Sequence, residues 1–452
     1  MFERLSRIAL RLGAAAICLI LSAVSSYAQT GSAPVLTLAD AIQIALKNNR
    51  PLKIVSLEVK KAEAQAAVTR SQRLPAFEIY NFASQPLLKT SFVFPEGAFG
   101  SFPSTGPIPP ASTTVSSPAR INTYLFNTIT QPLSQLYKLH LAVRLQELSV
   151  DASRQKVQAQ RQAVVANVKQ AYYTVLQTET AIHASEVMLQ HYRELDREMV
   201  QYVSQQTVLK SDSLEVKAKL AQEELNHLQL ADRLQSQKEY LNDLLGRDIR
   251  AEFQTEPAGK ITATAVSLAE AQDTALLHRP EIKQAEIAVR QAEYDRRLAK
   301  AQYIPDVGVA FHYLSNFNMD VLPRNFASVG LEAKWEPWDW GRRGQEVQAK
   351  QFTLEQSQEQ LRETKAQVLL DVNNRFRKLA ESRALLGVAE AQRDAAQEKL
   401  RVVANRFRVE ASLLRDLYQQ EAALAGTDQE YAQAVSTFWT AKAEFEKSLG
   451  EP

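Results

Sequence analysis

A short segment that occurs twice decides the fold. Residues 36–41 read LTLADA, and residues 266–271 read VSLAEA. Self-similarity at a fixed spacing is the sequence signature of a duplicated structural unit. We therefore expect two tandem copies of one unit, at residues 29–246 and 266–452, joined by a linker at residues 247–265.

Further matches extend the repeat to the end of each copy. They pair Arg50-Pro51 with Arg279-Pro280, Gln131-Pro132 with Glu336-Pro337, Asp212 with Asp416, and Leu245-Gly246 with Leu449-Gly450. The stretch from Pro75 to Pro132 is longer than its counterpart from Pro305 to Pro337, so the first copy carries an insertion. Each copy thus has the same order: a helix, two strands and a long helical hairpin.

Two kinds of helical stretch are expected in each copy. The first covers Leu38–Arg73 and Leu268–Tyr303 and ends at a proline, which cannot continue a helix. The second follows Pro132 and Pro337, where strong helix formers predominate. Helices this long persist only by packing against neighbours, so each second stretch should fold back on itself as a hairpin.

Matched acidic residues predict where each hairpin turns. Asp212 with Glu215, and Asp416 with Gln419, have the spacing of a capping box that begins a helix. Acidic residues are common in this chain, so chance is the alternative reading. The match nevertheless falls at the same position of both copies, and it predicts a returning helix over residues 212–245 in the first copy.

Alternation of apolar and polar residues predicts the strands. They are expected at 76–84 and 121–130 in the first copy and at 306–314 and 327–335 in the second. About ten residues suffice for a tilted membrane crossing. The pattern therefore predicts membrane strands, and its alternative is an amphipathic sheet on a soluble domain. The clearest strand has one wholly apolar face, formed by Val307, Val309, Phe311 and Tyr313.

Four strands cannot enclose a channel within one chain. The smallest membrane barrels have about eight strands, and an open sheet edge in lipid leaves backbone groups unpaired. Three chains would supply twelve strands, which enclose a water-filled lumen. Residues 85–119, rich in Pro, Ser, Thr and Gly, should form a mobile loop outside the membrane.

Aromatic side chains mark the expected boundary of the membrane. Trp335, Trp338 and Trp340 cluster where the last expected strand ends, and Tyr124 and Phe126 lie in a strand of the first copy. Tryptophan is enriched at membrane–water interfaces because its ring is apolar and its N–H is polar. We expect these five residues at the interface; for the tryptophans, the alternative is packing between strand and helix.

The N-terminus predicts export from the cytoplasm. Three arginines precede an apolar run, and residues 26–28 end in a small-x-small cleavage pattern. The run is short for an anchoring helix, so we expect residues 1–28 to be a cleaved signal peptide. It contains Cys18, the only cysteine, so the mature chain would have no disulfide, thiol nucleophile or thiolate metal site.

Composition excludes several classes of function. The signal peptide accounts for the formal net charge of +2, so the mature chain lacks the basic surface that nucleic acids require. No apolar run of about 20 residues follows the signal, which excludes a helical membrane protein. The six histidines form no evident ligand set, and phosphate-loop and zinc-protease motifs are absent. We expect no enzyme activity, no metal and no cofactor.

Over essentially the whole mature chain, the sequence resembles the TolC family of outer-membrane factors. The resemblance rests on the two repeated helix starts, on residues 130–136 (TQPLSQL) and 336–343 (EPWDWGRR) after the strand pairs, and on the paired helical tips. It implies a homotrimer with a twelve-stranded barrel in the outer membrane and an α-helical tunnel through the periplasm. It also implies two partners, an inner-membrane pump and a periplasmic adaptor (membrane fusion) protein.

The resemblance also implies a gate at the helical tips. Asp212 and Asp416 match acidic gate positions, although a capping role explains both equally well. Phe407 stands where the family has a locking tyrosine, Ser412 where it has an arginine, and Gln419 where it has a second aspartate. The residues expected to contact the adaptor are Gln206, Thr207, Glu410 and Ala411.

These observations predict a mainly helical protein with a membrane β-barrel portion. Its expected function is the passive exit duct of a tripartite efflux or type I secretion system, located in the outer membrane with a long periplasmic portion. Outer-membrane lipid would surround the barrel, and nucleic acid is no partner. The alternative is a periplasmic coiled-coil adaptor or scaffold, which would have no membrane strands.

Overall fold

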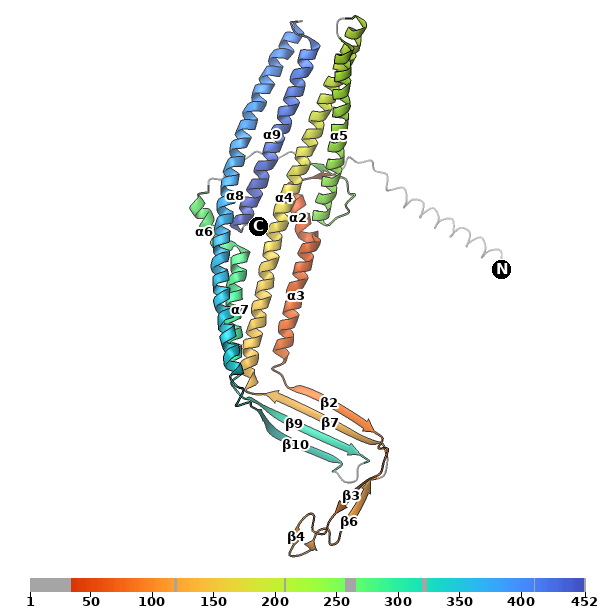
Figure 1. The fold of residues 1–452 in the computed structure, drawn as a ribbon, viewed down its shortest axis with the longest axis vertical. Helices are drawn as coiled ribbons and strands as arrows, with labels where there is room; N and C mark the ends of the chain where they lie inside the picture. The colour runs from red at the N-terminus through yellow and green to blue at the C-terminus, as the bar shows by residue number, and fades with distance from the viewer. Residues whose placement is uncertain are drawn as a thin grey trace, which may run out of the picture. The chain divides into compact units, whose positions relative to one another are not determined.

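The chain folds into two compact units. The first comprises the described parts of residues 1–50, 163–266 and 375–447, and the second those of 51–162, 267–374 and 448–452. The long helices α4 (Gln135–Ser204) and α8 (Arg342–Arg408) contribute a stretch to each unit (Figure 1). The computed structural model describes residues 34–117, 120–206, 209–256, 266–318, 323–409 and 411–450, so the expected signal peptide at 1–28 lies outside it.

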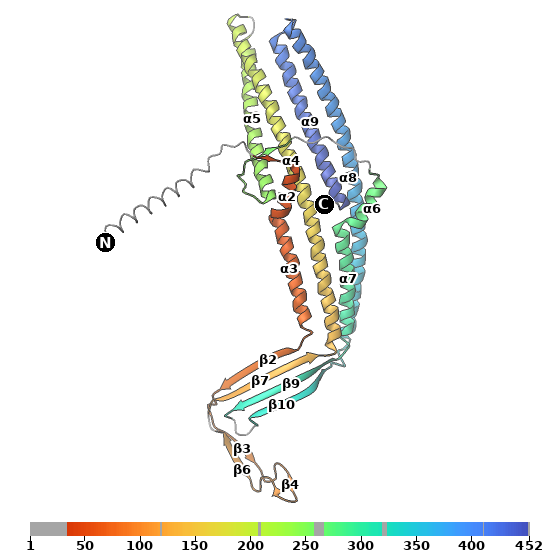
Figure 2. The same cartoon turned by 180° about the vertical axis from the view of Figure 1, so that it is seen from behind.

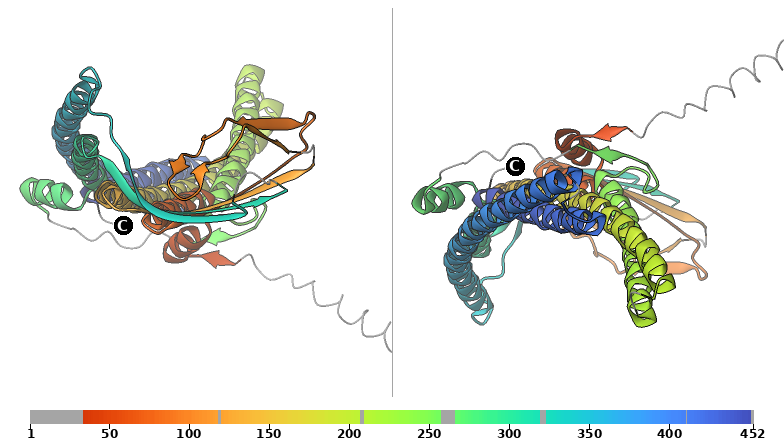
Figure 3. Two further views of the ribbon diagram at one scale, coloured as in Figure 1. Left: turned by 90° about the horizontal axis from the view of Figure 1, so that it is seen from below. Right: turned by 90° about the horizontal axis from the view of Figure 1, so that it is seen from above.

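In the second unit, four strands form one antiparallel sheet in the order β10-β9-β7-β2. They are β2 (Ala76–Ser84), β7 (Asn122–Pro132), β9 (Asp306–Phe317) and β10 (Asn325–Lys334). Each copy of the repeat supplies two neighbouring strands, and the pairing of β7 with β9 joins the copies into one curved sheet (Figure 3).

The insertion of the first copy forms two further hairpins. Strand β3 (Thr90–Phe94) pairs with β6 (Thr113–Ser117), and β4 (Ser101–Phe102) pairs with β5 (Gly106–Pro107), beyond one end of the sheet (Figure 2). The sequence predicted a mobile loop over 85–119, so this structure is a correction. Its β-branched and aromatic residues favour strands, and cross-strand pairs such as Phe92 with Val115 supply the contacts.

The helix that opens each copy is broken, which corrects the prediction of continuous helices over Leu38–Arg73 and Leu268–Tyr303. The pieces are α2 (Leu38–Asn48) and α3 (Arg50–Ser71) in the first copy, and α6 (Leu268–His278) and α7 (Pro280–Ala301) in the second. The breaks lie at Asn49 and Arg279, where ψ is 125° in both. Pro51 and Pro280 explain them, since proline lacks an N–H and disfavours helical conformation in the residue before it.

The first unit contains the distal parts of two helical hairpins, in which α4 turns into α5 (Lys210–Leu245) and α8 into α9 (Leu414–Leu449). Strand β1 (Val35–Leu36) lies parallel to β8 (Gln254–Thr255) beside them. Within the described residues, none of the helices combines the length and apolarity needed to cross a membrane. The core of this unit joins α4, α2, α5 and the β8 segment through residues such as Val168, Val175, Ala45, Leu241 and Phe253.

One tyrosine fixes the two-stranded sheet to α4. The Tyr172 hydroxyl donates to the Leu36 carbonyl at 2.9 Å and accepts from the Glu256 N–H at 2.9 Å. Burial raises the pKa of the Tyr172 phenol, so it stays a neutral donor. The matching residue of the second copy is Phe376, which cannot make these bonds.

Candidate functional site

The described residues beside each turn of the helical hairpins are mostly exposed. In the first hairpin, Gln206 adopts a left-handed φ of 58°, a conformation that glycine reaches at less cost. In the second, the Ala411 N–H donates to the Arg406 carbonyl at 2.9 Å. Gln206 and Ala411, two of the expected adaptor contacts, are exposed. The other two, Thr207 and Glu410, lie outside the described residues.

Asp212 and Asp416 occupy the same place in their helices. Each is the third helical residue, because α5 and α9 begin two residues earlier than the sequence predicted. The expected capping boxes that start at these aspartates are therefore wrong. The Asp416 carboxylate instead reaches back to accept from the Leu413 N–H at 3.3 Å, and it lies 3.6 Å from Arg415. Acidic residues in a first turn also stabilise the positive end of the helix dipole.

The remaining expected gate residues surround the second tip. The Ser412 hydroxyl donates to the Val403 carbonyl at 3.4 Å and so ties the turn to the end of α8. Phe407 on α8 and Gln419 on α9 are exposed. The tip therefore leaves both side chains accessible to a neighbouring chain or a partner.

The four-stranded sheet has one charge-free face and one charged face. Paired residues of an antiparallel sheet point to the same side, so the register assigns every side chain. The charge-free face contains Val309 with its partners Leu331 and Gln131, and none of its side chains is charged. In a membrane barrel, a charge-free face of this kind is the one that can contact lipid. The charged face holds all charged residues of the four strands: Glu78, Asp306, Glu332 and Lys334.

Tyr124 and Phe126 lie on the charged face. The Tyr124 ring stacks on Phe82 with centroids 6.3 Å apart, and the Phe126 ring stacks on His312 at 5.6 Å. Their expected place at the membrane interface stays a prediction. Strands β2 and β7 carry aromatic or aliphatic residues on both faces, so only the pairing register separates the two sides.

The three tryptophans after β10 are strongly exposed. The exposed fractions are 62% for Trp335, 71% for Trp338 and 90% for Trp340, and the last two rings meet edge to face at 5.9 Å. Arg343, just after the tryptophans, is by contrast largely buried, and its guanidinium lies 3.0 Å from the Glu336 carboxylate. The three tryptophans are therefore not packed between strand and helix, and their expected place at the membrane interface stays a prediction.

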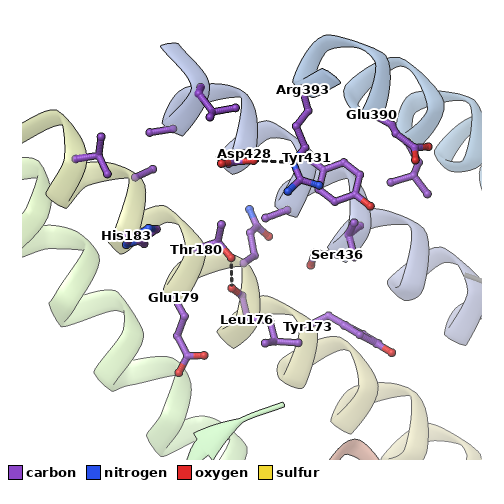
Figure 4. Close-up of a pocket in the computed structure, with 18 of the residues that line it drawn as sticks. Tyr173, Leu176, Glu179, Thr180, His183, Glu390, Arg393, Asp428, Tyr431 and Ser436 are labelled. Carbon is purple, nitrogen blue, oxygen red and sulfur yellow. Dashed lines mark hydrogen bonds and ion pairs between the residues drawn. The ribbon is translucent and has the colours of Figure 1, made fainter. Parts of the chain in front are cut away.

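A groove with a volume of ≈ 1370 Å³ lies within the first unit, lined by α4, α8 and α9 (Figure 4). On its α8–α9 side, Arg393 donates to Asp428 at 2.7 Å and covers the Tyr431 ring at 4.9 Å. On its α4 side, Glu179 pairs with Lys238 at 2.9 Å. The groove has no sequence signature, because its lining comes from helices far apart in the chain.

Two titratable groups, Tyr173, which is buried, and His191, which is half-buried, lie where α4 meets α9. The Tyr173 ring stacks on Trp439 at 5.4 Å, and burial raises the pKa of Tyr173 to about 12. Further along, the His191 ring lies 6.4 Å from Tyr418, and burial lowers the pKa of His191. Both groups are therefore uncharged at neutral pH, as a tight contact between two helices requires.

No group of three or more His, Cys, Asp or Glu residues in the described part of the chain is arranged to hold a metal ion. An antiparallel sheet with a charge-free face, whose strand pairs alternate along the chain with long helices, is instead typical of a protein that inserts strands into a membrane. The sequence profile of outer membrane efflux proteins matches residues 41–247 and 271–451. The chain belongs to this family and is an outer-membrane protein.

Solved structures share the fold at low identity. The CmeC outer membrane channel of Campylobacter jejuni is 16% identical, with a TM-score of 0.74 over 91% of this chain and 85% of that one. The outer membrane protein VceC of Vibrio cholerae is 17% identical, with a TM-score of 0.69 over 92% and 96%. A membrane protein of Pseudomonas aeruginosa is 15% identical, with a TM-score of 0.72 over 92% and 90%. No curated protein matches the chain.

These comparisons confirm the expected TolC-like fold and the resemblance to outer-membrane factors. They also confirm the predicted place in the outer membrane and a role in efflux as an exit duct, and they do not favour a periplasmic scaffold. The family and its structural neighbours are channel proteins.

Proposed function

We propose that three copies of this chain assemble into one passive channel that releases cargo through the outer membrane. The observation that carries the proposal is the sheet itself. Its outer strands β10 and β2 have no partner on their free edges among the described residues. Unpaired edges are not tolerated in lipid, so other chains must supply the missing partners.

The two faces of the sheet support the same assembly. Pairing β10 of one copy with β2 of the next, repeated around a threefold axis, closes twelve strands without leaving an edge. The charge-free face then contacts lipid, while Glu78, Glu332 and Lys334 face water inside. A barrel of this size is too wide for its own side chains to fill.

The helical tips supply the surface proposed for partners. Leu209, Val409 and Leu413 are exposed beside the turns, and exposed apolar groups at a defined place mark contact sites for other proteins. We assign these tips to contact with a periplasmic adaptor that links the duct to an inner-membrane pump. Asp212, Asp416, Phe407, Ser412 and Gln419 are the proposed gate residues.

The test combines assembly and conductance. The mature chain, purified from outer membranes in mild detergent, should migrate as a trimer that becomes a monomer after boiling. The trimer reconstituted in a planar bilayer should pass ions, and boiled protein, the control, should not. A monomer recovered from the soluble periplasmic fraction would contradict the proposal and favour a scaffold.

A further inference from the structure

The charged face of the sheet changes character along its strands. At the end joined to the helices it carries Glu78, Asp306, Glu332 and Lys334. At the end joined to the loops it carries no charge. Six side chains there are large and apolar or aromatic, and three are polar, Ser84, Asn122 and Asn316. The six are Tyr80, Phe82, Tyr124, Phe126, Leu314 and Phe326.

Four of these residues form one row across all four strands, which we call the apolar row. Tyr80 on β2 pairs with Phe126 on β7, Phe126 pairs with Leu314 on β9, and Leu314 pairs with Phe326 on β10. Directly paired side chains of an antiparallel sheet lie about 5 Å apart and on the same face. The apolar row is therefore continuous from one free edge of the sheet to the other.

The apolar row points into the lumen of the proposed channel. All charged side chains of the strands share its face, and the opposite face has none. A reversed orientation would put four charged residues per chain against lipid, which disfavours charged side chains on a lipid-facing strand surface. Three copies of the apolar row would line the exit half of the lumen as a ring.

The neighbouring chains of a trimer lengthen this ring but do not cover it. Each neighbour adds its own strand beside β2 or β10, so its side chains continue the row sideways. The exposed fractions of Tyr80, Phe126 and Phe326 are 62%, 39% and 53%. A twelve-stranded barrel leaves a wide water-filled space in front of them, so these rings stay accessible to molecules that pass.

We propose that the apolar row is a contact site for uncharged aromatic or amphipathic cargo on its way out. The site rests on the proposed function, because only a closed trimer turns the row into a ring. The aromatic rings of the row, which none of the charged residues of the four strands adjoins in the register, gain free energy by burying apolar surface and by stacking on aromatic groups. The tyrosine hydroxyls can bond to the polar part of an amphipathic molecule.

The test measures binding of two matched sugars to the wild-type trimer in lipid nanodiscs by saturation-transfer NMR. The probes are p-nitrophenyl glucoside, which carries an aromatic ring, and methyl glucoside, which does not. The wild type should bind only the nitrophenyl probe, after subtraction of empty nanodiscs. The double variant Phe126→Thr with Phe326→Thr should bind it about tenfold more weakly or not at all.

Phe92→Thr, in the hairpin outside the sheet, is the matched control and should bind like the wild type. If Phe92→Thr abolishes binding, the hairpin forms the site, and the proposal is wrong. Equal binding by the wild type and the double variant also overturns it, as does a wild type that does not prefer the nitrophenyl probe.

Heat-modifiable trimers establish that each variant is folded. If the double variant does not assemble, the single variant Phe326→Thr on the outer strand β10 takes its place, and unchanged binding by it overturns the proposal. The proposed function fails in a different way: the wild type would then yield no trimer and no conductance. A conducting trimer that binds neither probe removes the contact site alone.

Discussion

At the scale of single residues, two glycines mark the same junction in both copies. Gly246 has a φ of 66°, and a Cβ on it would lie 2.4 Å from the Asn48 carbonyl oxygen. Gly450 has a φ of 86°, and its Cβ would lie 2.8 Å from the His278 carbonyl carbon. Each returning helix thus ends against the break that the proline creates in its own copy.

Gly246→Ala should lower the melting temperature of the purified protein. The substitution adds a left-handed strain of about 1–3 kcal/mol and a clash with rigid backbone. Gly426→Ala is the control, because that helical glycine has open space around it, and alanine favours a helix by roughly 0.5–1 kcal/mol. An equal effect of the two substitutions would show that the junction is not tight.

His191 should make stability depend on pH. Its Nδ1 is buried and has no hydrogen-bond partner in the described residues, and burial lowers its pKa below the ordinary 6.5. The unfolded chain therefore binds a proton at His191 more readily than the folded protein does. The folding stability is highest above the pKa that His191 has in the unfolded chain, and it decreases as the pH falls below that pKa.

The corresponding measurement is thermal unfolding at about pH 7.5 and about pH 5.5. The loss of stability at the lower pH should shrink in His191→Gln and persist in His183→Gln. His183, the control, is an exposed histidine of the same helix, with 80% of its side chain accessible. An unchanged pH dependence in His191→Gln would assign the effect to another group.

The sequence predicted the junction glycines as repeat matches but misassigned the aspartates. Leu245-Gly246 and Leu449-Gly450 align because the same conformation is needed twice. Asp212 and Asp416 also align, yet the sequence does not distinguish an aspartate that caps a helix from one that is the third residue of the helix. Only the backbone shows that leucine precedes each helix and that the aspartate is its third residue.

At the scale of elements, composition and alternation locate the strands and the helical hairpins. The breaks in the helices depend on the prolines, and the faces of the sheet depend on how the strands pair. The break at Pro280 follows from the chemistry of proline, but the helical composition on both sides concealed it. The faces of Tyr124 and Phe126 could not be predicted, because alternation within one strand does not say which face meets lipid. That choice depends on the charged residues of the neighbouring strands.

Tyr172→Phe should loosen the β1–β8 segment without unfolding α4. The hydroxyl bonds two backbone groups, the Leu36 carbonyl and the Glu256 N–H, and leaving buried partners unsatisfied costs about 1–3 kcal/mol. Amide hydrogen exchange in residues 34–36 and 252–256 should become faster. Tyr240→Phe, which changes an exposed tyrosine, should leave it unaltered; equal rates in both variants would contradict the assigned role.

At the scale of the whole molecule, the number of strands predicts an oligomer and the structure shows which edges require it. Strands β2 and β10 come from different copies of the repeat, so closure joins the first copy of one chain to the second copy of the next. The trimer would thus alternate the two kinds of helical tip around its axis. The two tips differ in sequence, so they can divide the roles of gate and adaptor contact.

Asp416→Asn separates the gate role of this aspartate from its structural role. Asparagine can still accept from the Leu413 N–H, as the carboxylate does at 3.3 Å, but it carries no charge. If three Asp416 carboxylates lie near the trimer axis, removing their charge should reduce the block of the bilayer current by multivalent cations. The melting temperature should stay nearly unchanged. Asp212→Asn is the matched comparison for the other proposed gate aspartate, since Asp212 is the third residue of the equivalent helix. Reduced block in Asp416→Asn alone places the gate at the second tip. Reduced block in neither variant removes both aspartates from the gate and leaves them with the helix dipole as their function.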